Sequence, residues 1–535
     1  MKKQAIVSVY DKTGLEEFVG GLVELGIGIL STGGTAKFLK EKGIPVQSIS
    51  DYTQSPEILE GRVKSLHPRI HGGILARRDR EDDLRELQAN AISEIDFVVV
   101  NLYPFVQQVR RIEEAGDAGH ESLVEFIDIG GPTMIRAAAK NCRFVAPICD
   151  PADYPVILAE LRQSGSIAHE TRQRLAAKVF RMMAAYDGAI ARYFSLAERL
   201  LTSDGSRVKL APVESITLQQ EMTLRYGENP HQTAGLYRRY EAGEGSSSWW
   251  RQIQGKEISY NNLLDMHGAL DLFLEVSTGL DGAHAAVIIK HTNPCGAAVR
   301  KTALEAFRAA WSCDPLSAFG GIVAVSGVMT KELAEAIVEG FVEVVISGEV
   351  SPEGAAVFAK KKNVRLIECS LERYRAARSS GVMTMRNFYG DYLVQTADNE
   401  LKDLSGAKVA AGETPTAEQM QDFELAWKVC KHVKSNAIVI VKDRRAIGVG
   451  AGQMSRVDSA KLAVQRAGFH GHSVAGAVAA SDAFLPFPDT LEILNDAGVV
   501  GLVQPGGSIK DEDVVESAKK RSVVMLVTGE RHFRH

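Results

Sequence analysis

The chain lacks the cysteine spacing that structural zinc sites and disulfide frameworks require. No two of its cysteines form a CxxC pair. Scattered cysteines without such pairs favour a reducing compartment over a secreted, disulfide-linked fold. We therefore expect a cytoplasmic protein whose six cysteines are not paired. They are Cys142, Cys149, Cys295, Cys313, Cys369 and Cys430.

The chain also lacks a block of one charge sign and a long apolar run. Lys+Arg 62 against Asp+Glu 67 gives a net charge of −5, with no basic cluster of the kind that binds nucleic acid. No apolar stretch approaches the roughly 20 residues that a membrane helix needs. The first residues, Met1–Gln4, lead straight into an expected strand, so we expect no signal peptide. We expect neither nucleic acid nor a membrane as partner.

What the chain does have is length and a regular alternation of strand and helix patterns. Its 535 residues exceed one hydrophobic core and indicate several domains. The alternation predicts an α/β fold with a parallel sheet. We expect an N-terminal domain over residues 1–200, a linker over 201–219, and a C-terminal domain over 220–535 that splits again near 370–420.

Two loops of the N-terminal domain offer groups that suit anions. The strand expected at 27–30 runs into Ser31–Thr35, whose two glycines precede a helix expected at 36–42. Backbone N–H groups at such a helix start can hold a phosphate, although many glycine pairs serve geometry alone. The stretch 61–73 then places three cations and two histidines in a loop broken by glycine and proline.

Two further loops carry polar residues at comparable positions. Asn101-Leu102-Tyr103 follows a strand expected at 97–100, and Asp128–Thr133 precedes a helix expected at 134–140. We expect all four loops to meet at one edge of a parallel sheet. Their convergence predicts a nucleotide or phosphate site more strongly than any one of them.

The N-terminal strings SVYDKTGL, STGGTAKFL, GRVKSLHPRIHGGILAR, NLYPF and DIGGPTMIRAAAKN resemble the inosine monophosphate (IMP) cyclohydrolase domain of the bifunctional purine-biosynthesis family. The resemblance implies a methylglyoxal-synthase-like (MGS-like) fold that closes the second purine ring. It implies proton transfer by Lys140, supported by Lys64, Tyr103 and Asp128. It implies nucleotide binding by Tyr10, Asp11, Lys12, Thr32, Gly33, Gly34, Thr35, Arg62, Val63, Lys64, Ser65, Asn101, Leu102, Asp128, Ile129 and Gly130.

The chemistry of ring closure suits these residue types. A carboxamide nitrogen attacks a formyl carbon of the same molecule, and water is then expelled. Because the substrate itself supplies proximity, the enzyme mainly folds the substrate and moves protons. Desolvated or neighbouring lysines can be tuned for that task. We expect no catalytic metal.

In the C-terminal domain, a buried strand expected at 285–289 runs directly into Lys290 and His291. We expect Asn293–Gly296 to end this strand and turn the chain. Because ligands bind beyond the carboxyl ends of strands in open α/β sheets, the pair is expected to face substrate. The alternative is an ordinary strand end with a solvated lysine and a capping histidine.

The string KHTNPCGAAV and several later strings resemble the aminoimidazole carboxamide ribonucleotide (AICAR) transformylase domain of the same family. The resemblance implies two cytidine-deaminase-like subdomains and 10-formyltetrahydrofolate as co-substrate. Zinc deaminases carry a Pro-Cys-x-x-Cys motif. Here Pro294-Cys295 is followed by Gly296-Ala297-Ala298, so the second thiolate is absent.

Formyl transfer needs a base for the poorly nucleophilic 5-amino group, which suits His291. It also needs an acid and an oxyanion donor, which suit Lys290 and Asn436. The resemblance places Phe319, Phe487 and Asp489 at the folate, although both phenylalanines could be core residues, and Asn261 or Asn262 could be a helix N-cap. It implies substrate binding by Arg225, Tyr226, Asn262, Phe319, Gly320, Arg456, Phe487, Asp489, Ser508 and Arg531.

The resemblance implies two sequential activities, from AICAR through its formylated product (FAICAR) to IMP. It further implies a homodimer whose transformylase sites draw residues from both chains. A bound monovalent cation stays open. Two alternatives remain: a zinc nucleoside deaminase, which metal analysis would detect, and a nucleotide-binding module without catalysis.

Overall fold

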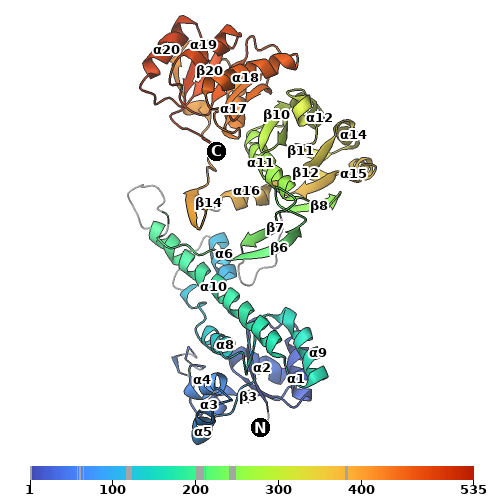
Figure 1. The fold of residues 1–535 in the computed structure, drawn as a ribbon, viewed down its shortest axis with the longest axis vertical. Coiled ribbons are helices and arrows are strands. Elements are labelled where there is room, and N and C mark those ends of the chain that lie inside the picture. The colour runs from blue at the N-terminus through green and yellow to red at the C-terminus, as the bar shows by residue number, and fades with distance from the viewer. Residues whose placement is uncertain are drawn as a thin grey trace. The chain divides into compact units, whose positions relative to one another are not determined.

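The computed structural model describes residues 3–56, 58–59, 62–63, 65–115, 123–200, 210, 212–239, 249–379 and 383–535. It divides into two compact units, Met1–Gln220 with Tyr237–Ser246 and Glu221–Leu236 with Ser247–His535. We call them the N-terminal and the C-terminal unit (Figure 1). Within the described ranges, no helix is long and apolar enough to cross a membrane.

The N-terminal unit is built on a five-stranded sheet in the order β3-β2-β1-β4-β5. Every pairing in it is parallel. β4 has the sequence FVVV and is buried throughout, as expected for a parallel strand covered on both faces. The expected parallel α/β fold is thus confirmed. Its strands are β1 (Gln4–Ser8), β2 (Gly28–Ser31), β3 (Gln47–Ser48), β4 (Phe97–Val100) and β5 (Ala146–Ile148).

Helices cover both faces of this sheet. Alternate residues of β1 point to opposite sides, so Ile6 packs in one hydrophobic cluster with α8 and α10 while Val7 packs in the other with α1 and α9. The helices are α1 (Leu15–Glu24), α2 (Gly33–Glu41), α3 (Ile49–Thr53), α4 (Pro68–Leu75), α5 (Glu81–Ala89), α6 (Phe105–Ala115), α8 (Gly130–Lys140), α9 (Tyr154–Ser164) and α10 (His169–Leu200), with the 3-10 turn η2 (Pro151–Asp153).

Two of these helices begin earlier than predicted. α2 starts at Gly33 rather than at Ala36, because the chain enters the helix directly after the extended Thr32. α8 starts at Gly130 rather than at Met134, because the Asp128 carboxylate accepts a 2.9 Å hydrogen bond from the N–H of Gly131 and supports an earlier first turn.

The C-terminal unit contains a twelve-stranded sheet in the order β16-β21-β20-β19-β17-β18-β10-β9-β11-β12-β13-β8. β6 (Leu218–Leu224) pairs with β7 (Ala234–Arg239), and β14 (Met383–Phe388) pairs with β15 (Asp391–Thr396). The strands of the large sheet are β8 (Trp250–Gln254), β9 (His284–Lys290), β10 (Asn293–Arg300), β11 (Gly321–Met329), β12 (Val342–Val350), β13 (Arg365–Cys369), β16 (Lys408–Ala411), β17 (Ile438–Lys442), β18 (Arg445–Gly450), β19 (Val478–Ser481), β20 (Gly501–Gln504) and β21 (Val524–Val527).

Helices again cover both faces. Val287 of β9 and Val439 of β17 pack in one cluster with α11 and α17, while Ile288 and Ile440 face the helices of the other side. The helices are α11 (Tyr260–Val276), α12 (Ala303–Trp311), α13 (Pro315–Ala318), α14 (Lys331–Glu339), α15 (Pro352–Ala359), α16 (Leu371–Ser379), α17 (Ala417–Lys431), α18 (Arg456–Phe469), α19 (Asp489–Asp496) and α20 (Asp511–Lys520), with the 3-10 turn η3 (Leu404–Gly406).

The start of α11 differs from the expectation that Asn261 or Asn262 caps it. Ser259 is the N-cap, and its hydroxyl accepts a hydrogen bond from the N–H of Asn262 while the Asn262 side chain accepts from the N–H of Ser259. This reciprocal capping box satisfies two backbone donors. Asn262 is therefore held in place by the helix start.

Strand direction decides which loops meet in this unit. β9 is antiparallel to β10 and β11. The rule that ligands bind beyond the carboxyl ends of the strands therefore does not apply to this part of the sheet, where neighbouring strands run in opposite directions. Reading the pairings across the sheet, the carboxyl ends of β9, β18, β19, β20 and β21 share one edge with the amino ends of β11, β12, β13 and β17. We call it the Lys290 edge, after the last residue of β9.

A buried charge network ties three helical segments of the C-terminal unit together. The carboxylate of Glu275 on α11 lies 2.6 Å from a guanidinium nitrogen of Arg378, 2.8 Å from Lys431 Nζ and 2.8 Å from His432 Nε2. Burial raises the pKa of Glu275, but these three partners outweigh it, so the net pKa lies well below the usual carboxyl range. Removing the carboxylate would leave buried cations unpaired.

We predict that Glu275→Gln lowers the free energy of unfolding by about 3 kcal/mol, the usual result of removing one partner from a buried ion pair. The depressed pKa means that this deficit is full above about pH 4.3 and shrinks below it, as wild-type Glu275 takes up a proton and loses its pairs. Urea unfolding at a series of pH values measures it. Glu335→Gln, at an exposed carboxylate of α14, is the control; an equal loss there contradicts the prediction.

Candidate active sites

Asn101 joins the predicted loop after β4 to the loop after β1. Its side-chain oxygen accepts hydrogen bonds from the N–H groups of Tyr10 at 2.6 Å and Asp11 at 3.0 Å, and its amide nitrogen donates to the Asp11 carbonyl at 2.9 Å. The rings of Tyr10 and Tyr103 then meet edge to face, with centroids 5.8 Å apart. The loops after β1 and β4 thus lie together.

The loop after β2 reaches the same place through Thr35. Its hydroxyl accepts from the Val9 N–H at 3.1 Å and donates to the Val9 carbonyl at 2.9 Å. This exchange holds the first turn of α2, with Gly33 and Gly34, beside the end of β1. A Cβ added to Gly34 would meet nothing within 4 Å, so this glycine faces open space.

The Asp128 loop packs tightly against the residues around it. A Cβ on Gly130 would lie 2.3 Å from Ser65 Oγ, and one on Gly131 would lie 2.6 Å from Asp128 Oδ2 and 3.1 Å from Leu102 Cδ2, so a side chain at either position would displace its neighbours. The Tyr186 hydroxyl accepts a 2.9 Å hydrogen bond from the Asp128 N–H. The four predicted loops therefore converge at one sheet edge.

Tyr103 stands out chemically among these residues. Its side chain is 42% exposed, and its partial burial together with the charge of Asp128 raises its pKa. The phenol therefore stays protonated near neutral pH, so it can donate a hydrogen bond or a proton to a bound ligand.

Three further predicted residues differ in where they stand. Lys140 is exposed and is the last residue of α8, which places it about 15 Å along the helix axis from Gly130. Arg62 forms an exposed ion pair with Glu125. Lys64 lies outside the described residues.

In the C-terminal unit, Lys290 and His291 lie at a hairpin turn. Lys290 pairs with Asn293 across it, so the two-residue loop is His291-Thr292, with φ of 51° and 59°. The expectation that Asn293–Gly296 ends the strand is wrong, because these residues begin β10. Left-handed φ values disfavour ordinary L-residues by roughly 1–2 kcal/mol each, so other contacts must hold this turn.

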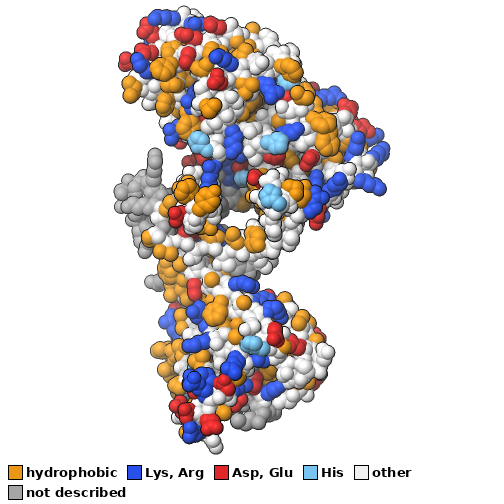
Figure 2. All heavy atoms as spheres, viewed as in Figure 1, with side chains coloured by type: hydrophobic (Ala, Val, Ile, Leu, Met, Phe, Trp, Pro, Cys, Tyr) orange, Lys and Arg blue, Asp and Glu red, His pale blue; other side chains and the backbone are white. Residues whose placement is uncertain are grey.

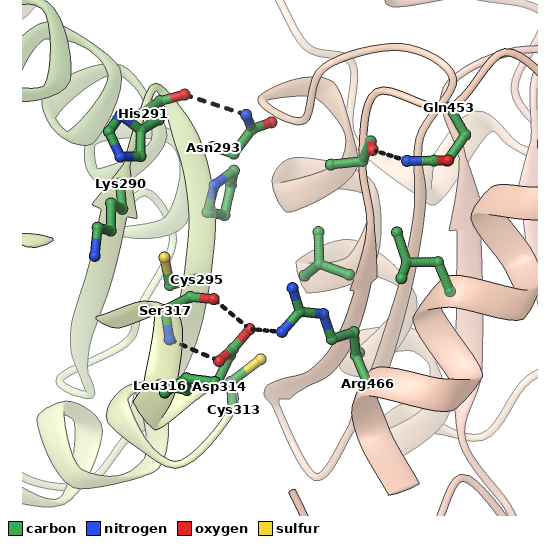
Figure 3. Close-up of a pocket in the computed structure, with 15 residues that line it drawn as sticks. Lys290, His291, Asn293, Cys295, Cys313, Asp314, Leu316, Ser317, Gln453 and Arg466 are labelled. Carbon is green, nitrogen blue, oxygen red and sulfur yellow. Dashed lines mark hydrogen bonds and ion pairs between the residues drawn. The ribbon is translucent and has the colours of Figure 1, made fainter. Parts of the chain in front are cut away.

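A cavity of about 540 Å³ opens beside Lys290 and His291 (Figure 3). One wall is the β9–β10 hairpin with Cys295, and the opposite wall carries Gln453 and Arg466. Burial raises the pKa of Cys295 to about 12, which keeps the free thiol protonated near neutral pH. Among the described residues, no group of three His, Cys, Asp or Glu side chains could hold a metal ion.

Asn436 approaches this cavity from the start of β17. Its amide nitrogen donates to the carbonyl of Gln453 at 2.9 Å, and Gln453 lines the cavity. Asn293 links this segment to the hairpin, because its side chain accepts from the Lys434 N–H at 3.0 Å and donates to the His291 carbonyl at 3.2 Å. The base and the amide predicted for one reaction are thus connected through Asn293.

A second cavity, of about 430 Å³, lies along the same edge. Arg225 and Tyr226 line it, with the guanidinium 4.6 Å from the ring centroid and 2.8 Å from the hydroxyl. Asn262 lines it too and donates to Glu343 at 2.8 Å. Three further lining residues were not predicted from the sequence, because each is a single charged residue at or near the end of a different strand and belongs to no motif. They are Lys256, Glu343 and Arg365.

Lys290 stands between the two cavities. Its ammonium donates to the Phe319 carbonyl at 2.5 Å, and the Phe319 ring packs on Phe341 with centroids 5.0 Å apart. Phe341 lines the 430 Å³ cavity, whereas Lys290 lines the other. Gly320, with φ of 77°, lets the chain pass close to both side chains.

The remaining predicted residues form a second group farther along the Lys290 edge. Phe533 lies under the guanidinium of Arg531 at 4.5 Å and near that of Arg456 at 5.7 Å. Phe487 and Asp489 follow β19, which is four strands from β9, about 19 Å at the usual strand spacing.

Ser508 belongs to the same group, since it follows the neighbouring strand β20. Phe319 and Phe487 are each 57% exposed, so neither is a core side chain. Both rings are therefore free to contact a ligand, but one chain brings only Phe319 next to Lys290.

Comparisons with known proteins identify the family of the chain. A model of the AICARFT/IMPCHase bienzyme family matches residues 138–466, and a model of the MGS-like domain matches residues 14–133. The protein called "Bifunctional purine biosynthesis protein PurH" of Bacillus cereus is 46% identical over 535 residues, 100% of each chain. Its namesakes in Bacillus anthracis and Bacillus cytotoxicus are 45% identical, again over 100% of each chain.

A solved structure, "Crystal structure of ForH", is 37% identical and covers 36% of this chain and 100% of that chain. Its TM-score of 0.32 is too low to support an argument about the fold. The sequence identities over the whole chain and the matched family models are decisive. The chain belongs to the AICARFT/IMPCHase bienzyme family, the bifunctional transferases and hydrolases of the last two steps of IMP biosynthesis.

Proposed function

We propose that the C-terminal unit transfers a formyl group from 10-formyltetrahydrofolate to the 5-amino group of AICAR, and that the N-terminal unit closes the product, FAICAR, to IMP. The observation that carries the first assignment is the position of Lys290, between the cavity beside His291 and the cavity of Arg225 and Tyr226. A reacting group placed there touches both bound substrates.

His291 is the proposed base. The lone pair of the 5-amino group is delocalised into the imidazole and the carboxamide, so the amine needs to lose a proton as its nitrogen bonds to the formyl carbon. A histidine is the side chain best suited to accept a proton near neutral pH. The exposed turn presents His291 toward the cavity rather than into the core.

Lys290 and Asn436 are the proposed acid and oxyanion donor. As the bond between the formyl carbon and the folate nitrogen breaks, that nitrogen takes a proton from Lys290. The carbonyl oxygen carries negative charge in the tetrahedral intermediate, and a positioned amide N–H of Asn436 stabilises it. Removing one such donor typically raises a barrier by roughly 3–4 kcal/mol.

The cavity of about 430 Å³ is the proposed nucleotide site. Acidic and basic side chains are interspersed over the visible face of the C-terminal unit (Figure 2), so a phosphate must be held by a local set of cations. Arg225, Lys256 and Arg365 supply three in this cavity, and Glu343 offers an acceptor for amide or hydroxyl protons.

Folate is proposed to lie against Phe319, with Phe487, Asp489 and Ser508 completing its site. Within one chain, β11, which follows Phe319, and β19, which precedes Phe487 and Asp489, are five strands apart, about 24 Å at the usual strand spacing. We therefore propose a homodimer in which the edges of two chains face each other, so that Phe487 and Arg531 of one chain act beside Lys290 of the other. Two-fold symmetry would create two equal sites.

Ring closure is proposed at the converged loops of the N-terminal unit. The glycine pair at the start of α2 suits the phosphate, since backbone N–H groups and the helix dipole favour an anion there. The protonated Tyr103, next to Asp128, can donate to the oxygen that leaves as water. The family resemblance implies proton-transfer roles for Lys64 and Lys140 as well. Because Lys140 lies at the far end of α8 from these loops, the proposal for the loops depends on Tyr103 and Asp128.

We predict that the purified protein converts AICAR and 10-formyltetrahydrofolate to IMP. The His291→Ala variant should lack formyl transfer but should still close supplied FAICAR at the wild-type rate. The two reactions use different units, so they separate. Chromatography of the nucleotides follows both reactions. Equal loss of both activities in a folded variant would falsify the assignment.

Tyr103→Phe is expected to show the reverse pattern. Losing the phenolic proton should slow ring closure on the order of 10²-fold, the usual effect of a positioned acid, and leave formyl transfer unchanged. Lys140→Ala should also spare formyl transfer. A severe loss of ring closure in Lys140→Ala, with Tyr103→Phe active, would move the reaction from the loops to the far end of α8.

The shared-site dimer predicts complementation between two inactive variants. His291→Ala and Arg531→Ala are each expected to lack formyl transfer. Mixing them under conditions that exchange subunits should restore about a quarter of wild-type activity, because half of the dimers are hybrids and each hybrid has one intact site. No recovery, with hybrids shown by mass spectrometry, would contradict sites built from two chains.

A further inference from the structure

Both backbone N–H groups of the His291-Thr292 turn are held by one carboxylate. Asp265 Oδ2 accepts from the N–H of His291 at 3.1 Å, and Oδ1 accepts from the N–H of Thr292 at 2.6 Å. Asp265 lies on α11, far from the hairpin in sequence. Each of its two oxygens thus accepts a hydrogen bond from one of two adjacent backbone N–H groups in the proposed catalytic turn.

The turn needs such support because its residues do not favour its conformation. A two-residue hairpin loop with positive φ at both positions is normally built from asparagine and glycine. Here the positions hold histidine and the β-branched threonine, at φ 51° and 59°. The sequence therefore keeps a functional side chain at a strained position, and the contacts that over-determine the turn come from α11.

α11 is a rigid base for this contact. Its capping box joins Ser259 and Asn262, and Asn262 lines the proposed nucleotide cavity one helical turn before Asp265. A Cβ on Gly268 would lie 3.8 Å from the Cα of Thr292, so the helix runs close against the turn. The same turn of helix thus faces the nucleotide and fixes the hairpin.

We propose that Asp265 is a positioning residue for formyl transfer, which holds the imidazole of His291 in register with a nucleotide bound beside Asn262. The inference rests on the role proposed above for His291. Asp265 acts through the backbone, since both of its oxygens are engaged there. Loss of the Asp265 carboxylate should therefore lower kcat and leave the affinity for the nucleotide nearly unchanged.

The test compares Asp265→Ala and Asp265→Asn with wild type. A displaced base should lower kcat for formyl transfer on the order of 10²-fold, the cost of misplacement by about 1 Å. KM for AICAR should change less than about threefold, because the nucleotide contacts remain. Closure of supplied FAICAR should be unchanged. Hydrogen exchange at the amides of His291 and Thr292 should accelerate, since both lose their acceptor.

Rescue separates positioning from general destabilisation. Thr292→Gly, added to Asp265→Ala, should recover part of kcat, because glycine adopts positive φ without strain and lets the turn form unaided. The matched control is Asp271→Ala, which removes another carboxylate of α11, one bonded to the Tyr374 hydroxyl at 2.8 Å. Its kcat should equal that of wild type.

Each outcome decides the inference. Unchanged kcat in folded Asp265→Ala, or a kcat loss that Asp271→Ala matches, overturns it. If Asp265→Ala does not fold, the same comparison in Asp265→Asn decides, with amide exchange as the second readout. Full formyl transfer in His291→Ala overturns the proposed function itself, whereas activity lost in His291→Ala but kept in Asp265→Ala overturns the positioning role alone.

Discussion

The direction of β9 in the twelve-stranded sheet is the constraint on which the C-terminal site depends. Because β9 and β18 are both antiparallel to β10, the two halves of the sheet present the same edge. Lys290 then meets the amino ends of β11 and β12, where Phe319 and Phe341 lie, and the start of β17, where Asn436 lies. Reversing one strand would separate the base, the amide and the nucleotide cavity.

Long-range polar contacts then fix what the sheet brings together. Asn293 joins the hairpin to the segment of Asn436, Asp265 joins it to α11, and the buried Glu275 joins α11 to α16 and α17. Buried polar groups of this kind are costly unless every partner is present, so they select one arrangement among many that hydrophobic packing would allow. The precision needed for catalysis comes from these few groups.

Much of the fold could be predicted from the sequence because buried strands such as β4 and β9 read as apolar runs. The approach of the loops after β2 and β4 also followed from parallel strands, whereas the loops at 61–73 and 128–133 lie between helices. The hairpin turn could not be predicted. Asn293–Gly296 contains the asparagine, proline and glycine that are typical of turns, whereas histidine and threonine at 291 and 292 are not. Asp265 and Glu343 gave no signal either, because a lone carboxylate in a helix or at a strand start acquires its role only through distant residues.

The two units meet different chemical demands with different backbones. Formyl transfer joins two separate molecules, so a base, an acid and an oxyanion donor must be aligned at once. The proposed base, His291, lies in a turn whose two residues are both at positive φ. Ring closure is intramolecular, and the loops at 10–12, 101–103 and 128–131 contain no non-glycine residue at positive φ. Because the substrate already brings its reacting atoms together, strain would add little to ring closure, and the site proposed in the N-terminal unit consists of glycines, hydrogen-bonded loops and a protonated phenol.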